Sequence, residues 1–113
     1  MTVDQIDVSD EMQECIDKCF EAVEVCEWCA DECIEVGDED LARCIRLCRD
    51  VTDIAATCAR FCSRDAEHVS QIAGLCADVC EDCADECEQH DMEATDACVD
   101  VLRECAELCR DMS

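Results

Sequence analysis

The sequence predicts an all-α protein, an antiparallel up-down-up-down four-helix bundle with a cysteine-lined core. The 113-residue chain has no proline and two glycines, so it lacks the residues that turn-rich folds need. Cysteine accounts for 16 residues, and the apolar and cysteine positions recur at alternating spacings of three and four. That spacing is the heptad pattern of packed helices. At this length we expect one domain spanning residues 1–113.

The first helix is expected over about residues 10–36. Ser9 is a good N-cap residue, two acidic residues follow it in the first turn, and Gly37 suits the left-handed conformation that ends a helix. The spacing directs one face of this helix inward. Its inward positions are Met12, Cys15, Cys19, Ala22, Cys26, Cys29, Cys33 and Val36.

The second helix is expected over about residues 39–63. Leu47, Ile54 and Phe61 repeat every seven residues beside its seam and widen the buried face, as a bundle helix requires. A polar stretch follows this helix. The inward positions are Leu41, Cys44, Cys48, Val51, Ala55, Cys58 and Cys62.

The third and fourth helices are expected over about residues 67–90 and 92–112. Gly74 lies inside the third helix, at a cost of about 1 kcal/mol relative to alanine. The inward positions of the third helix are Val69, Ala73, Cys76, Cys80, Cys83, Cys87 and His90. Those of the fourth helix are Cys98, Leu102, Cys105, Cys109 and Met112.

The chain is interpreted as two copies of one helical hairpin. Residues 25–44 match residues 79–98 at ten of twenty positions, an internal duplication with an offset of 54. Short connections between the helices make neighbours antiparallel. The two dense cysteine runs, 26–33 and 80–87, are therefore expected side by side on the first and third helices. They would put six thiols toward the end of the bundle where both helices finish.

The net charge of −24 comes from 32 acidic residues against seven arginines and one lysine. This charge excludes a nucleic-acid binder, which needs a basic surface. Half of the residues are apolar and periodic, which argues against a disordered acidic chain. We expect an acidic surface like that of proteins from salt-accumulating halophiles, where salt screens the self-repulsion. An acidic shell that coexists with bound monovalent cations is the alternative.

A cytoplasmic location is expected. The first residues, 1–8, lack the basic and apolar regions and the cleavage site of a signal peptide. No apolar run is long enough to span a membrane, so we expect no membrane partner. Disulfides are rare in the cytosol, so cysteines there favour metal binding or redox chemistry.

All 16 cysteines fall on the predicted seams, and several chemistries compete to explain them. One or two could serve as small buried apolar residues, but leucine would fill a core better. Disulfides between helices are conceivable, whereas pairs four residues apart on one helix are poorly placed to bridge. The spacing of residues 26–33 resembles that of ferredoxins, but their motif wraps a loop around the cluster. A zinc site needs only four ligands, although zinc or cadmium thiolate clusters remain conceivable.

Soft thiolates select Cu(I), which accepts two or three sulfur ligands and lets each thiolate bridge neighbouring ions. Roughly one Cu(I) ion per thiolate would leave the core near neutral. Without metal, the neutral thiols can pack as small apolar groups. We therefore predict a metal site of multiple Cu(I) ions whose ligands are Cys15, Cys19, Cys26, Cys29, Cys33, Cys44, Cys48, Cys58, Cys62, Cys76, Cys80, Cys83, Cys87, Cys98, Cys105 and Cys109.

This pattern resembles the bacterial and archaeal copper storage proteins, over about residues 10–112. The resemblance rests on inward cysteines along every helix, including the Cys-x3-Cys pairs Cys15/Cys19, Cys44/Cys48, Cys58/Cys62, Cys76/Cys80, Cys83/Cys87 and Cys105/Cys109. It implies storage of many Cu(I) ions, restricted access at one end, and a homotetramer of bundles. The lack of a signal peptide is similar to the cytosolic branch. The apolar seam positions Ala22, Val51, Ala55, Ala73 and Leu102 depart from the family pattern and interrupt the sulfur column.

The resemblance also implies histidine and methionine at the open end. His90 and Met92 lie where the first and third helices finish, and we expect the copper mouth there. A solvated His90 stabilised by the helix dipole is the alternative, and Met12, Met112 and His68 mark the opposite end.

Phe20 and Trp28 lie on the far side of the first helix from its seam. They suit a subunit contact or are lone exposed apolar residues.

The predicted function is cytosolic Cu(I) storage or sequestration by a binding protein, not an enzyme. The alternative is a zinc or other heavy-metal thiolate detoxification protein. A thiol redox enzyme would need an exposed cysteine of low pKa at a helix N-terminus, which mid-helix cysteines do not supply. The expected partners are copper ions, a copper chaperone or efflux protein, and other copies of the chain.

Overall fold

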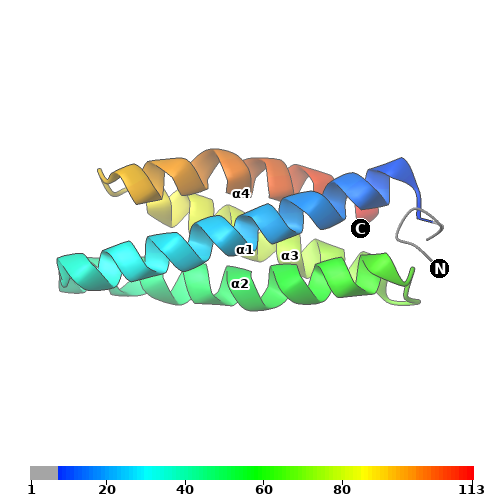
Figure 1. Ribbon diagram of the computed structural model, residues 1–113, viewed down its shortest axis with the longest axis horizontal. Coiled ribbons are helices and arrows are strands. Elements are labelled where there is room, and N and C mark those ends of the chain that lie inside the picture. The colour runs from blue at the N-terminus through cyan, green and yellow to red at the C-terminus, as the bar shows by residue number, and fades with distance from the viewer. Residues whose placement is uncertain (1–7) are drawn as a thin grey trace.

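The computed structural model describes residues 8–113 and forms a bundle of four α-helices. The elements are α1 (Asp10–Val36), the short 3-10 turn η2 (Glu39–Leu41), α2 (Ala42–Ser63), α3 (Val69–Cys87) and α4 (Glu93–Met112). Successive helices run in opposite directions, and the start of α1 and the end of α4 lie at the same end of the bundle (Figure 1). The predicted up-down-up-down fold is confirmed. The N-terminal residues used to predict the absence of a signal peptide lie almost entirely outside the described part.

Helix α1 is delimited by the expected capping residues. The Ser9 hydroxyl accepts a hydrogen bond from the Met12 amide, 3.1 Å away. At the other end Gly37 has φ of +73° and donates its amide hydrogen bond to the Cys33 carbonyl. Only glycine adopts this left-handed conformation readily, so the helix ends here. A helix of 27 residues is about 40 Å long, which accounts for most of the 46 Å length of the bundle.

Helix α3 is shorter than the predicted range of residues 67–90. It begins at Val69 because the preceding turn, in which Asp65 has φ of +46°, ends with a hydrogen bond from the Val69 amide to the Ala66 carbonyl. It ends at Cys87 because the amides of Gln89 and His90 donate to carbonyls three residues back, not four. His90 therefore lies in the loop, half-buried, and not on the seam.

The hairpin end of the bundle, where α1 meets η2 and α3 meets α4, differs from prediction in two further ways. Residues 39–41 form a 3-10 turn ahead of α2, capped by the Asp38 carboxylate. Val36, predicted to face inward, is 59% exposed. The antiparallel register that brings Cys19 to Cys105 places Asp31 level with the first residue of α4, so the last turn of α1 projects beyond its neighbour.

The helices pack in a ring in which α1 contacts α2 and α4, and α3 contacts the same two helices. Helices α1 and α3 are therefore diagonal, and the expectation that their dense cysteine runs lie side by side is wrong. Short hairpin connections make α1–α2 and α3–α4 neighbours, and the ring closes through α2–α3 and α4–α1. The two runs face each other across the core.

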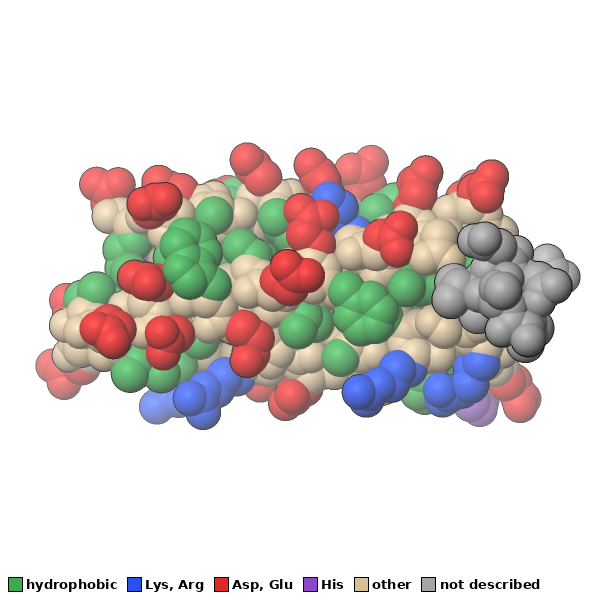
Figure 2. All heavy atoms as spheres, in the orientation of Figure 1, with side chains coloured by type: hydrophobic (Ala, Val, Ile, Leu, Met, Phe, Trp, Pro, Cys, Tyr) green, Lys and Arg blue, Asp and Glu red, His purple; other side chains and the backbone are tan. Residues whose placement is uncertain are grey.

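Acidic side chains cover much of the face shown in Figure 2, whereas basic side chains line its lower edge, where α2 lies. Five of the seven arginines belong to α2 or directly follow it. Ion pairs connect α4 to its neighbours: Lys18 reaches Glu104 at 2.8 Å, and Arg110 lies between Asp78 and Glu81. These pairs are exposed and contribute little individually. Within the described residues, no helix is long and apolar enough to cross a membrane.

Candidate metal centre

Every cysteine of the chain faces the core and is fully buried, at 0% exposure. All 16 are free thiols. Each of the four helices contributes cysteines from its heptad seam, because side chains three and four residues apart share a helix face. The core is therefore a sulfur-lined interior in which cysteines account for 16 of the 30 buried apolar side chains.

The thiols divide into two groups of eight along the bundle. The terminal pool, near the two chain ends, takes two cysteines from each helix: Cys15, Cys19, Cys58, Cys62, Cys76, Cys80, Cys105 and Cys109. The hairpin-end pool, near the α1–α2 and α3–α4 connections, takes three from α1, two each from α2 and α3, and one from α4: Cys26, Cys29, Cys33, Cys44, Cys48, Cys83, Cys87 and Cys98.

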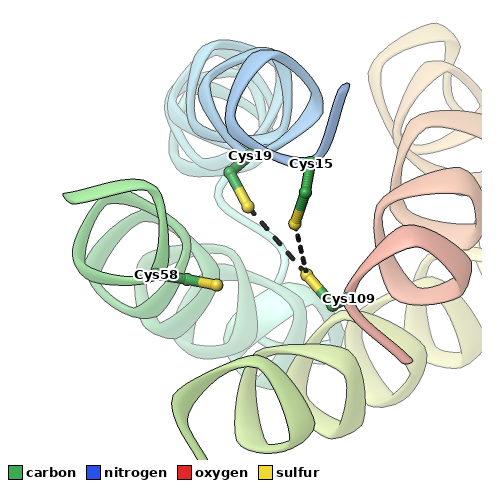
Figure 3. A group of neighbouring side chains, drawn as sticks. All are labelled: Cys15, Cys19, Cys58 and Cys109. Carbon is green, nitrogen blue, oxygen red and sulfur yellow. Dashed lines mark hydrogen bonds between the residues drawn. The ribbon is translucent and has the colours of Figure 1, made fainter. Parts of the chain in front are cut away.

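The terminal pool holds two sets of four sulfur atoms close enough to share a metal ion. In the first, Cys15, Cys19, Cys58 and Cys109 converge from α1, α2 and α4 with all four sulfurs within 4.8 Å of one another (Figure 3). The Cys15 and Cys109 sulfurs are 3.7 Å apart. The second set joins Cys19 and Cys109 to Cys76 and Cys105. Because two thiols belong to both sets, ions bound there would share ligands.

The hairpin-end pool has the same character. Cys29, Cys48, Cys87 and Cys98 form a set of four from all four helices, and Cys29 and Cys48 each belong to a further set of three. Cys33 and Cys44 complete the set that contains Cys29, and Cys26 and Cys83 complete the set that contains Cys48. The Cys48 and Cys83 sulfurs lie 3.8 Å apart, and those of Cys44 and Cys87 lie 3.9 Å apart. This pool also offers bridging thiols.

An apolar layer separates the two pools. It consists of Ala22 on α1, Val51 on α2 and Leu102 on α4, all fully buried, with Ala55 one turn along α2. The α1–α4 register that brings Cys19 to Cys105 places Ala22 opposite Leu102. None of these side chains carries an atom that binds metal.

Hydrogen bonds between thiols raise the pKa of some cysteines in each pool and lower the pKa of others. Bonds from Cys44 and Cys48 lower the pKa of Cys29 to about 4, whereas burial raises the pKa of Cys33 above its ordinary value. In the terminal pool, the bond with Cys109 lowers the pKa of Cys105, and the bond with Cys105 raises that of Cys19. A thiolate is the form that binds metal. Each pool thus contains both thiols of lowered pKa and thiols of raised pKa.

A surface pocket of about 530 Å³ lies over the hairpin-end pool, lined by η2 and the α3–α4 loop. Glu86, 6% exposed, forms one of its walls. One carboxylate oxygen accepts a bond from Arg43 at 2.8 Å, and the other lies 2.8 Å from His90 Nε2. The hydrogen bond with His90, and to a smaller extent that with Arg43, lowers the pKa of Glu86. His90 and Met92 both line this pocket.

The sequence did not single out the Glu86–Arg43 pair beside this pocket. Glu86 precedes Cys87 by one residue, and its spacing of four from His90 was the only available signal. The partner on α2, 43 residues away, depends on how the helices pack. At the opposite end His68 is exposed, while Met12 and Met112 are half-buried against the core.

Comparison with known sequences places this arrangement in a family. The sequence profile of the copper storage proteins matches residues 8–113. The chain is 36% identical over 100 residues to the cysteine-rich protein YhjQ of Bacillus subtilis, an alignment covering 88% of this chain and 93% of that protein. The shared region therefore includes nearly the whole bundle.

Solved structures show the same architecture. The Cu(I)-bound copper storage protein BsCsp3 of Bacillus subtilis is 35% identical, with a TM-score of 0.84 over 91% of this chain and 98% of that one. Ccsp of Streptomyces lividans, loaded with 10 copper equivalents, is 29% identical, with a TM-score of 0.85 over 99% of this chain and 89% of that one. By sequence and by fold, the chain belongs to the copper storage protein family.

Proposed function

We propose that this protein stores Cu(I), binding several ions per chain through the thiolates of its two pools. The observation that carries the proposal is the sharing of thiols: Cys19, Cys109, Cys29 and Cys48 each belong to two sets of converging sulfurs. Bridging thiolates are characteristic of Cu(I), which needs only two or three sulfur ligands. Each ion that replaces a thiol proton leaves the buried core uncharged, which avoids the cost of isolated charges.

The test is an anaerobic Cu(I) titration of the reduced protein against a chromophoric Cu(I) chelator. We expect tight uptake that approaches the 16 cysteines of the chain. Binding should release protons, so uptake should weaken as the pH is lowered. Saturation at one or two ions per chain would contradict the proposal.

A zinc or other heavy-metal detoxification protein is the second candidate, and the sets of four sulfurs are what favour it. Zinc prefers four thiolates in a closed tetrahedron. The shared thiols disfavour zinc, because adjacent closed sites would compete for Cys19 and Cys109. Mass spectrometry of protein recovered from cells, followed by competition between Cu(I) and Zn(II), separates the two. Recovered protein that holds zinc and keeps it against Cu(I) would favour the second candidate.

The copper mouth is proposed at the pocket over the hairpin-end pool. Glu86 holds His90 Nε2, an arrangement in which a carboxylate fixes one ring nitrogen and leaves Nδ1 free to bind metal. His90→Ala with Met92→Leu should slow Cu(I) loading without changing the final number of ions. His68→Ala, at the opposite end, is the matched control. Equal loading rates for the two variants would move the mouth elsewhere.

We also propose where the protein acts and what it contacts. The protein is proposed to act in the cytoplasm as a binding protein without catalytic activity, receiving copper from a chaperone or passing it to an efflux protein. Phe20 and Trp28, 46% and 41% exposed on α1, are proposed as a contact within a homotetramer. Light scattering of the eluted protein, with Phe20→Ser/Trp28→Ser as the variant, tests this contact. A variant that stays tetrameric would exclude it.

A further inference from the structure

The apolar layer between the two pools takes side chains from α1, α2 and α4 but none from α3. The α2–α3 register that brings Cys48 to Cys83 places Val51 level with Cys80. Ala22 and Leu102 occupy the corresponding places on α1 and α4. Cys80, a thiol of the terminal pool, is therefore the only metal-binding side chain at this level among the described residues. Bonding to Cys105 raises the pKa of Cys80, and Cys105 belongs to the same pool.

The axial gap between the cysteines of the two pools is shortest on α3. The helical rise is about 1.5 Å per residue. Between the pools, Cys19 and Cys26 on α1 are therefore about 10.5 Å apart along the axis, as are Cys98 and Cys105 on α4. On α2 the gap from Cys48 to Cys58 is about 15 Å. On α3 the gap from Cys80 to Cys83 is only about 4.5 Å.

No sulfur–sulfur contact within 4.0 Å crosses from one pool to the other among the described residues. All five sets of converging thiols lie wholly within one pool or the other. The five sulfur–sulfur contacts of 3.7–4.0 Å are also internal to a pool. A Cu(I) ion in an apolar layer without ligands would carry an uncompensated charge into a medium of low dielectric constant. Movement between the pools therefore requires a thiol within the layer.

We infer that the pools hold separate Cu(I) clusters and that one pool is filled through the other by a single step, between Cys83 and Cys80. This inference rests on the proposed Cu(I) storage. In the step, a new Cu–S bond forms to the receiving cysteine and the bond to the donating cysteine breaks. The proton of the receiving thiol passes to the released thiolate. Copper and proton thus move in opposite directions, the core stays uncharged, and no redox change occurs.

The first test adds a second crossing. Ala22→Cys places a thiol three residues from Cys19 and four from Cys26, and Ala22→Ser is the matched control because oxygen is a poor ligand for Cu(I). Loading is followed by stopped-flow absorbance of the Cu(I)–thiolate bands under anaerobic conditions. The unmodified protein should load in two phases of similar amplitude. Ala22→Cys should accelerate the slow phase by at least about tenfold, and Ala22→Ser should not.

The second test removes the crossing. Cys80→Ala lengthens the gap on α3 to that between Cys76 and Cys83, about 10.5 Å, as on α1 and α4. Cys62→Ala is the matched control, since Cys62 is an equally buried thiol of the same pool that lies far from the layer. Both variants should lose similar capacity, but only Cys80→Ala should slow the second phase, by at least about tenfold. If circular dichroism shows that Ala22→Cys does not fold, the comparison of Cys80→Ala with Cys62→Ala tests the inference by itself.

The outcomes separate this inference from the proposed storage function. Uptake near the number of cysteines in a single phase overturns the two-pool inference and leaves storage intact. Equal rates for Cys80→Ala and Cys62→Ala also overturn it. Saturation at one or two ions contradicts storage itself and is read from stoichiometry, not from rate.

Discussion

The two thiol pools have equal numbers of cysteines but different surroundings. The hairpin-end pool lies beneath a polar pocket with Glu86, His90 and Met92 in its wall. At the other end of the bundle, the buried Val69 and the half-buried Phe61 are apolar side chains that belong to the core or pack against it. Both pools offer the same soft ligands and are equally buried, so what distinguishes them is the polar pocket beside the hairpin-end pool. The comparison of the two pools is therefore a way to test the proposed copper mouth.

The largest effect should follow from removing the shared thiols of either pool. Cys29→Ala/Cys48→Ala disrupts every converging set at the hairpin end, and Cys19→Ala/Cys109→Ala does so at the terminal end. Because bridging thiolates hold several ions together, each double variant should lose roughly a third to a half of the copper capacity. Native mass spectrometry of the loaded protein measures this loss.

The same pair of variants tests the direction of filling. If copper enters at the hairpin end, the Cys29/Cys48 variant should load the terminal pool more slowly. The Cys19/Cys109 variant should leave the fast phase unchanged. The reverse pattern would place the mouth at the terminal end. Circular dichroism of both metal-free variants controls for loss of the fold.

The next effect concerns the layer that separates the pools. Among residues 8–113, Leu102 is the largest fully buried side chain. Leu102→Ala should leave a cavity and destabilise the metal-free protein by about 2–5 kcal/mol. Leu108→Ala, on the same helix but half-buried, should cost about 1 kcal/mol. Urea unfolding under reducing conditions measures both, and equal losses would show that the layer is not tightly packed.

A smaller effect is expected at the pocket wall. Glu86→Gln replaces the charge that Arg43 and His90 share and should cost about 1.5–3 kcal/mol in the metal-free protein at neutral pH. Glu104→Gln, whose ion pair with Lys18 is exposed, should cost about 0.5 kcal/mol. Equal losses in urea unfolding would show that the Glu86 contacts stabilise the fold no more than an exposed ion pair does.

The pH dependence of the Glu86 contribution has a defined sign. Bonding to His90 and Arg43 lowers the pKa of Glu86 in the folded protein below the ordinary value of 4.5. Its contribution is therefore complete above pH 4.5 and is lost as the pH falls through the folded-state pKa. The stability difference between wild type and Glu86→Gln should shrink over that range in urea unfolding. A difference independent of pH down to 3 would refute this role.

The two pools also show where sequence reasoning stops. The heptad spacing placed the 16 cysteines on the seams because helix periodicity is local information. The repeat offset of 54 makes Cys29 equivalent to Cys83, yet the structure brings Cys29 to Cys87 and Cys26 to Cys83. Helix α1 is thus shifted against α3 by three to four residues, about 5 Å or one turn, relative to the repeat. That shift depends on tertiary packing, and it places Ala22 level with Cys80.

The contacts beside the pocket could not be predicted from the sequence, because they too depend on tertiary packing. The Glu86–Arg43 pair joins two helices whose relative rotation is fixed by core packing. The end of α3 at Cys87 depends on loop hydrogen bonds, including that from the Thr95 hydroxyl to the His90 carbonyl. The duplication of the hairpin and the single domain stay predictions from the sequence.

The smallest effect is expected for the surface charge, and it bears on how both pools are filled. With a net charge of −24, the chain repels itself, and raising KCl from 0.1 to 1 M shortens the screening length from about 10 Å to 3 Å. The melting temperature should therefore rise by a few degrees, about 1 kcal/mol of stability. If each Cu(I) replaces one proton, loading leaves the net charge unchanged. The metal-free and fully loaded proteins should then show the same salt dependence and elute from an anion exchanger at the same salt concentration. Later elution of the loaded form would mean that the pools contain more thiolates than copper ions, with the excess charge buried beside the metal.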